Sequence, residues 1–274
     1  MEDGIPVAGV AGDQQSALFG QACFSPGSAK CTYGTGAFVL LNTGSKKIYS
    51  KNRLLTTIAY RINGKTTYAM EGSIFIAGAG VQWLRDRMKF FKKAPETEKI
   101  VKSLQNNNDI YLVPAFTGLG APYWDANARG VLSGITRDTS PKEIVRATIE
   151  AVAYQTHDLF EAMKHDGLRP KIVKVDGGMV MNNWFSQFLS DIVNVKVLRP
   201  KVQETTALGA AFMAGLNIGV YKSLKDISKN WQLDKKFSSK MKNTSRANRA
   251  HRMQRRPCGN RHQDTSRIHQ RDIA

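Results

Sequence analysis

Two spacings of apolar residues alternate along the chain and predict an α/β fold. Short apolar runs bounded by Gly, Asn and Asp are typical of strands, whereas apolar positions three and four residues apart are typical of helices. The run at 6–12 predicts a short buried strand that ends at Asp13, and the apolar residues at 17–19 then have helical character.

Antiparallel β-structure is expected between residues 31 and 71. Apolar runs at 37–41, 54–62 and 66–69 are separated by Asn42-Thr43-Gly44 and by Asn63-Gly64. The second pair predicts a two-residue hairpin, because both central positions of such a turn take positive φ.

Helical spacing marks two long segments. In 73–91 the apolar positions recur every three or four residues, which predicts one long helix. The other helix has a well-defined start, with Ser140 as N-cap, Pro141 at the first position and Glu143 closing a capping box, and it is expected to reach about residue 164.

The carboxyl-terminal part alternates strand and helix. Residues 171–175, 182–193, 196–198 and 206–216 read as strand, helix, strand and helix. This order favours parallel strands with ligands at their carboxyl ends. A strand at 110–113 precedes a loop rich in Gly, Pro and aromatic residues at 114–130, which is too long for a simple connector and favours a functional role.

Composition excludes several classes of protein. The 274 residues are 42% apolar and 23% charged, as in ordinary globular proteins, so a collagenous, disulfide-dense or wholly disordered chain is excluded. No apolar stretch is long enough to span a membrane, and the first residues do not resemble a secretory signal. The three cysteines form no metal-spaced cluster, so reduced thiols in a cytoplasmic protein are expected.

The net charge of +18 is concentrated in the tail. Residues 240–274 hold ten Lys or Arg against two Asp, so nearly half of the excess lies in about one-eighth of the chain. The tail is therefore strongly basic for its length, and the body is only moderately basic.

The turn Gly12-Asp13-Gln14-Gln15 is the first with candidate chemistry. A carboxylate at a strand exit can act as a general base, because burial and neighbouring groups tune its pKa. Gln14 offers a donor and an acceptor to a polyol hydroxyl. Spacing alone favours the plainer alternative, in which Asp13 caps the following helix.

Two glycine-containing turns could lie against phosphates or a nucleotide. In Tyr33-Gly34-Thr35-Gly36, backbone amides and one hydroxyl can approach a phosphate, but the lysine of a Walker loop is absent and a plain β-turn is the simpler interpretation. Asp176-Gly177-Gly178, followed by Asn182, can expose a helix N-terminus to a nucleotide, and a tight β–α connection fits equally well. The loop at 117–125 also fits an Ω-like loop packed by its own aromatic residues.

Taken together and in this order, the motifs resemble those of glycerol kinases within the carbohydrate kinase superfamily. The resemblance spans residues 4–237 and is carried by segments 9–20, 33–36, 71–73, 82–86, 114–125, 175–178 and 204–211. It implies an actin-like ATPase, ribonuclease-H-like α/β domain with a mixed sheet flanked by helices. This domain would be residues 1–237, the carboxyl-terminal, nucleotide-binding half of a two-domain kinase.

The resemblance also implies an activity: ATP-dependent, Mg²⁺-assisted phosphorylation of glycerol to glycerol 3-phosphate, in a family whose members are homo-oligomers. Asp13 would be the catalytic base, and Asp13, Gln14 and Phe38 would bind glycerol. The nucleotide, ATP or ADP, would be held by Thr35, Gly78, Gln82, Gly178 and Asn182. No residue of this chain is assigned to a metal, and no membrane partner is expected.

Two departures from the family pattern limit these expectations. The amino-terminal domain of the family is absent from this sequence, so the chain alone is expected to have little or no kinase activity. After about residue 237 the family pattern is lost. The basic segment 238–274 reads either as the product of a shifted reading frame or as a disordered arm. Such an arm would bind nucleic acid only non-specifically, with an affinity that falls steeply with salt.

Two alternatives to a glycerol kinase stay open. The chain could belong to another polyol or sugar kinase of the same superfamily, which shares the strand plan and glycine turns. It could also be a non-catalytic nucleotide-binding module with a basic interaction tail.

Overall fold

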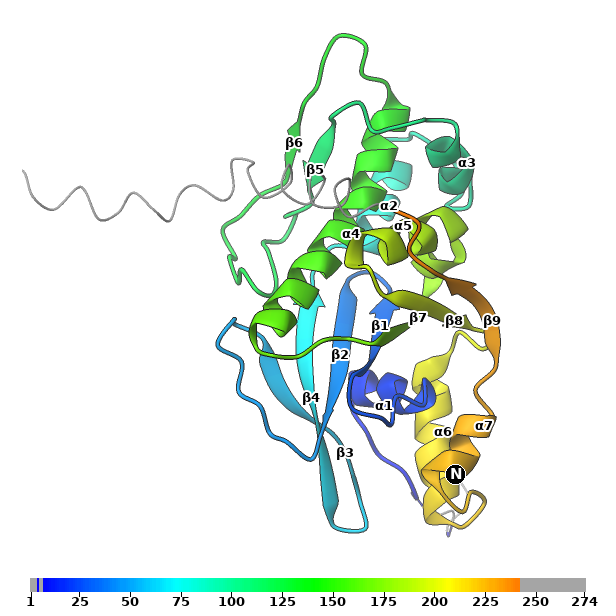
Figure 1. Ribbon diagram of the computed structural model, residues 1–274. Coiled ribbons are helices and arrows are strands. Elements are labelled where there is room, and N and C mark those ends of the chain that lie inside the picture. The colour runs from blue at the N-terminus through cyan, green and yellow to red at the C-terminus, as the bar shows by residue number, and fades with distance from the viewer. Residues whose placement is uncertain (1–3, 5–6, 242–274) are drawn as a thin grey trace, which may run out of the picture. The chain divides into compact units, whose positions relative to one another are not determined.

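The main sheet has seven strands in the order β3-β4-β2-β1-β7-β8-β9 (Figure 1). The structure is a computed structural model that describes residue 4 and residues 7–241. Met1–Ser239 form one unit and Lys240–Ala274 a second. The strands are β1 (Ser28–Tyr33), β2 (Ala37–Gly44), β3 (Leu55–Ile62), β4 (Lys65–Ile74), β7 (Ile172–Asp176), β8 (Lys196–Pro200) and β9 (Leu233–Phe237).

The sheet is mixed, as the sequence predicts. β1 pairs with β2 antiparallel and with β7 parallel, and β7 pairs with β8 parallel. Since Thr32 of β1 is in register with Asp176 of β7, the two parallel strands end side by side. The turns that follow them therefore open at the same edge of the sheet.

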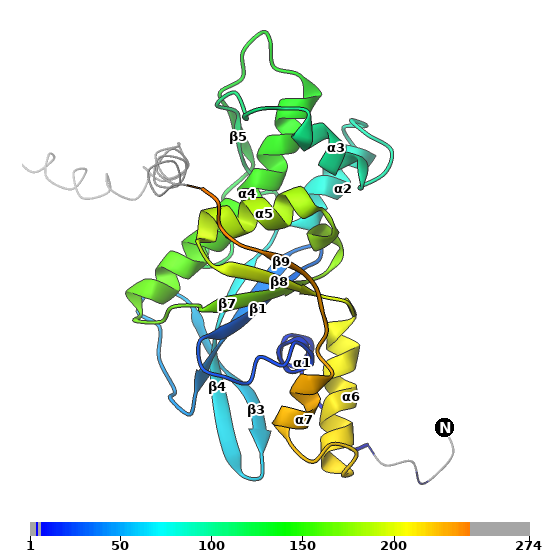
Figure 2. The same ribbon diagram turned by 45° about the vertical axis from the view of Figure 1, so that its right-hand side comes forward.

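Helices cover both faces of the sheet (Figure 2). One face carries α1 (Asp13–Gly20), α6 (Thr205–Asn217) and α7 (Leu224–Lys229), and the other carries α4 (Pro141–His165) and α5 (Asn183–Val193). The remaining elements are α2 (Gly78–Asp86), α3 (Glu96–Lys102), the short helix η1 (Gly178–Met181) and a separate pair of strands, β5 (Tyr111–Val113) and β6 (Val131–Ser133). No helix within residues 7–241 combines the length and apolar character needed to cross a membrane.

Side-chain alternation on β1 separates the two layers. The Tyr33 hydroxyl bonds to Thr156 of α4 at 3.0 Å, and its ring packs edge-on against Phe185 of α5. Lys30 instead donates to Gln14 of α1, on the opposite face. Because successive residues of a strand point to opposite faces, β1 places Tyr33 in the layer with α4 and α5 and Lys30 in the layer with α1.

Local signals in the sequence are confirmed where they act within a few residues. Asn63 and Gly64 have φ of +49° and +75° and join β3 to β4. Ser140 caps α4, and the reciprocal contacts of a capping box with Glu143 are both present. The carboxyl-terminal order of strand, helix, strand and helix also matches β7, α5, β8 and α6.

The strand predicted at 6–12 is wrong for its described residues. Residues 7–12 form no strand, and Val7 and Val10 are each 83% exposed. The segment instead lies against α6, where a Cβ on Gly9 would come within 2.6 Å of the Ala214 nitrogen, and the Asn217 side chain donates to the carbonyl of Ala8 at 3.1 Å.

The helix predicted at 73–91 is too long, because only Gly78–Asp86 is helical. Ser73 still belongs to β4 and pairs with Phe38 of β2, so the first residues of the predicted helix belong to the sheet instead. Asn42-Thr43-Gly44, expected to separate strands, is instead the irregular end of β2. Most of the predicted basic tail, residues 242–274, lies outside the described residues.

Candidate functional site

A cavity of about 400 Å³ opens where β1 and β7 end. It contains all five residues that the family resemblance assigns to a nucleotide: Thr35, Gly78, Gln82, Gly178 and Asn182. They come from the turn after β1, from α2, and from the η1–α5 turn after β7. The structure therefore brings together residues that are up to 147 positions apart in the chain.

The turn after β1 and the start of α2 are bound to each other. The Gly78 amide donates to the Gly34 carbonyl at 2.9 Å, and the Ala77 and Ala79 amides donate to the Thr35 carbonyl at 2.9 and 3.0 Å. A Cβ on Gly78 would lie 2.5 Å from the Gly34 oxygen, so only glycine allows this approach. Thr35 and Gln82 consequently line the same side of the cavity.

The two glycines after β7 have different reasons to be glycine. Gly177 has φ of +92°, and a Cβ there would lie 2.4 Å from the Tyr33 carbonyl oxygen, so it is required by the tight connection. Gly178 has no such φ, and a Cβ there would meet nothing within 4 Å. Its missing side chain leaves open space in the cavity, which is the arrangement that a ligand lying on the backbone needs.

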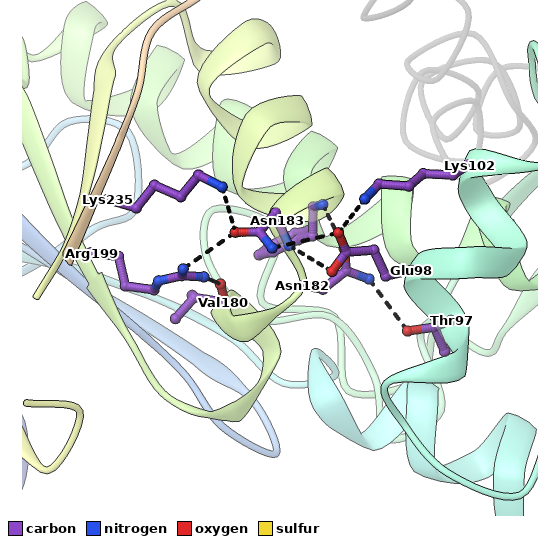
Figure 3. Close-up of polar contacts among 9 residues, drawn as sticks. Thr97, Glu98, Lys102, Val180, Asn182, Asn183, Arg199 and Lys235 are labelled. Carbon is purple, nitrogen blue, oxygen red and sulfur yellow. Dashed lines mark hydrogen bonds and ion pairs between the residues drawn. The ribbon is translucent and has the colours of Figure 1, made fainter. Parts of the chain in front are cut away.

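Asn182 fixes the η1–α5 turn. Its side-chain oxygen accepts from the Phe185 amide at 3.0 Å and caps α5, and its nitrogen donates to Thr97 of α3 at 3.3 Å. Asn182 therefore joins one wall of the cavity to another (Figure 3).

The rest of the lining is largely apolar, with polar groups at a few points. The apolar members are Val81, Ala94, Pro95, Ile149, Met179 and Met181. Glu98 adds a carboxylate. Partial burial raises its pKa, but hydrogen bonds from Lys102 and from the Asn183 amide outweigh burial and hold the pKa below its usual value. A largely apolar cavity with a few directed polar groups suits a small organic ligand that carries polar groups.

The residues predicted to bind the acceptor do not line this cavity. Asp13 is exposed at the first position of α1, where Gly12 is the N-cap, so Asp13 is not the cap that spacing favours. Its carboxylate accepts a hydrogen bond from the Gln14 backbone amide at 2.8 Å and another from the Gln14 side-chain nitrogen at 3.1 Å. Phe38 lies next to Thr32 on the sheet face that α1 covers.

Lys30 organises this second group, and sequence reasoning missed it. It is fully buried, and its ammonium donates to the Gln14 side-chain oxygen and, at 3.1 Å, to the Thr32 hydroxyl. Burial lowers the pKa of Lys30, and the carboxylates of Asp176, Glu71 and Asp13 oppose that shift. Burial also raises the pKa of Glu71, against the attraction of Lys30. A lysine in the otherwise uncharged strand β1 was the available signal.

Comparison with known proteins agrees with this arrangement. The carboxyl-terminal domain of the FGGY family of carbohydrate kinases matches residues 29–218. The chain belongs to this family. The matched region contains the whole lining of the cavity, from Tyr33 to Asn182, and Phe38 and Lys30 of the acceptor group.

Individual relatives show which members of the FGGY family this chain resembles. Glycerol kinase 1 of Pseudomonas aeruginosa is 59% identical over 237 residues, which cover 86% of this chain and 48% of that protein. The structure of Plasmodium falciparum glycerol kinase with ADP superposes with a TM-score of 0.83 at 42% identity, over 88% of this chain and 49% of that one. Xylulose kinase from Lactobacillus acidophilus shares the fold, with a TM-score of 0.77 at 23% identity over 89% and 48%. This FGGY chain thus spans about half the length of the curated relatives it matches.

Proposed function

We propose that this chain is the nucleotide-binding half of a glycerol kinase. The observation that carries the proposal is the cavity at the ends of β1 and β7, in which five dispersed motif residues meet and Gly178 leaves open space. The similarity to glycerol kinases, one of them determined with ADP, supports ATP or ADP as the nucleotide.

The proposed roles follow the two groups of residues. Thr35 lies near the transferring phosphates, and Gly78, Gln82, Gly178 and Asn182 hold the nucleotide. On the other face Asp13 accepts the proton of a glycerol hydroxyl, Gln14 binds a hydroxyl, and Phe38 covers the carbon face. Phosphoryl transfer depends mainly on positioning and charge neutralisation, so such dispersed turns suit it.

Mg²⁺ would neutralise phosphate charge when bound with the nucleotide. Among residues 4 and 7–241, no three His, Cys, Asp or Glu side chains gather closely enough to hold a metal ion. The proposed ion would reach this site together with the phosphates of the nucleotide. Its use by this protein is part of the proposal.

Several sequence-based expectations remain proposals. They are the domain boundary at residue 237, a cytoplasmic location, homo-oligomers of the complete enzyme, and non-specific binding of nucleic acid by the tail. Little or no kinase activity of the chain alone is another, because the residues above supply only part of a glycerol site.

A coupled assay tests the proposed reaction. The chain alone should turn over little glycerol, whereas a chain joined to the amino-terminal half of the P. aeruginosa relative should phosphorylate glycerol in preference to xylulose or gluconate. In that joined protein Asp13→Asn should lower kcat by about 10²–10⁴, the contribution of a placed general base. A preference for a sugar would contradict the proposal and would instead indicate another kinase of the family.

A further inference from the structure

Asn183 lies between groups of opposite charge beside the cavity (Figure 3). Its side-chain oxygen accepts from Arg199 and from Lys235, each at 3.2 Å. Its side-chain nitrogen faces Glu98 at 3.5 Å, and its backbone amide donates to the same carboxylate at 3.1 Å. Because cations only donate and a carboxylate only accepts, these neighbours fix the orientation of the amide.

Two of these neighbours, Arg199 and Glu98, are themselves held in place. Arg199 of β8 is 5% exposed, pairs with Asp234 at 2.7 Å and donates to the Val180 carbonyl of η1 at 2.7 Å. Glu98 of α3 pairs with Lys102 at 2.5 Å. Asn183 thus connects α3 to a buried arginine of the sheet.

This connection crosses between two walls of the cavity. Glu98 and Thr97 line it from α3, and Gly178 and Asn182 line it from the η1–α5 turn. Within residues 7–241, two side-chain pairs join these walls: Asn182 with Thr97 at 3.3 Å and Asn183 with Glu98 at 3.5 Å. Asn183 does not line the cavity, so it can act only by placing Asn182 and α3.

We propose that Asn183 is a positioning residue that keeps α3 closed against the η1–α5 turn and so slows release of bound nucleotide. The inference rests on the proposed binding of ADP or ATP in this cavity. Loss of the Asn183–Glu98 contact should clearly raise the rate of nucleotide release. Its effect on the melting temperature of the chain without nucleotide should be smaller.

Stopped-flow release of a fluorescent methylanthraniloyl-ADP from the full 274-residue chain tests this. Asn183→Asp keeps the acceptor toward Arg199 but turns an oxygen toward Glu98, and should speed release about tenfold, the effect of one hydrogen bond to a charged group. Adding Glu98→Gln supplies a donor to the new carboxylate and should restore most of the original rate.

Glu161→Gln is the matched control. It removes a carboxylate from an exposed ion pair with Lys164 on α4, outside the cavity, and should neither change release nor rescue Asn183→Asp. If Glu161→Gln rescued Asn183→Asp as completely as Glu98→Gln does, the effect on release would not come from the contact between Asn183 and Glu98.

The remaining outcomes separate the inference from the proposed function. If the unmodified chain binds no methylanthraniloyl-ADP, the proposed nucleotide site fails. If it binds and Asn183→Asp lowers only the melting temperature without changing release, the positioning role is wrong. Should Asn183→Asp not fold, Glu98→Ala removes the acceptor of both the side-chain and the backbone amide of Asn183, and an unchanged release rate there would also overturn the role.

Discussion

The ammonium of Lys30 donates to the side-chain oxygen of Gln14, and this fixes which way the amide faces. Since lysine offers only donors, the amide nitrogen must point the other way, toward Asp13, at 3.1 Å. A buried cation thereby orients the exposed carboxylate proposed as the base, through one intervening side chain.

Lys30→Met should destabilise the chain. The variant keeps most of the length of the side chain but leaves the oxygens of Gln14 and Thr32 without their donor, which costs about 1–3 kcal/mol. Urea unfolding measures the change in the free energy of unfolding. Lys65→Met, at an exposed position of β4, is the control and should stay within about 0.5 kcal/mol. Equal stability of the two variants would show that the buried contact contributes nothing.

The carboxylate of Asp166 should make the free energy of unfolding depend on pH in the acidic range. Partial burial raises its pKa, but hydrogen bonds from Ser50, Lys51 and Asn52 outweigh burial and hold the pKa below the usual 3.8. A lowered folded-state pKa gives stability that is present above the unfolded-state value and is lost as pH falls through the folded one.

Unfolding of the wild type and of Asp166→Asn should therefore differ most near neutral pH. The difference should shrink as the pH drops below about 4, near the ordinary pKa of an aspartate. A difference that stays constant from about pH 7 to pH 3 would show that the charge of Asp166 is not what secures residues 50–52.

Gly177→Ala should damage the fold rather than the ligand site alone. Its φ of +92° and the 2.4 Å approach of a Cβ to the Tyr33 oxygen would force β1 and β7 apart. Strain of this kind costs about 1–3 kcal/mol, and the clash adds to it. Thermal unfolding without nucleotide measures the loss, and an unchanged melting temperature would mean that the connection tolerates a side chain.

The sequence predicts best those features that depend on near neighbours. The capping box of Ser140 and the hairpin at Asn63-Gly64 are set by backbone geometry within four residues, so the residue types suffice. The parallel order of β7 and β8 follows from chain order in the same way.

Features set by distant packing were not predictable. The start of α2 at Gly78 depends on carbonyls of the turn after β1, and the path of residues 7–12 depends on α6. The sequence likewise names Asn182 but not Asn183 or Glu98, because their partners lie in separate elements. The resemblance to known motifs supplied the five cavity residues, which periodicity alone left in ordinary turns or within the helix predicted at 73–91.

Calorimetric titration with ADP of the wild-type chain and of Gly178→Val tests the central claim most directly. A side chain at this position has space in the fold but fills the cavity. We predict that the wild type binds ADP, and that the variant melts at the same temperature without nucleotide yet binds at least about tenfold more weakly, a loss of about 1.4 kcal/mol. Equal affinity of the two proteins for ADP would contradict a nucleotide site between Thr35 and Asn182.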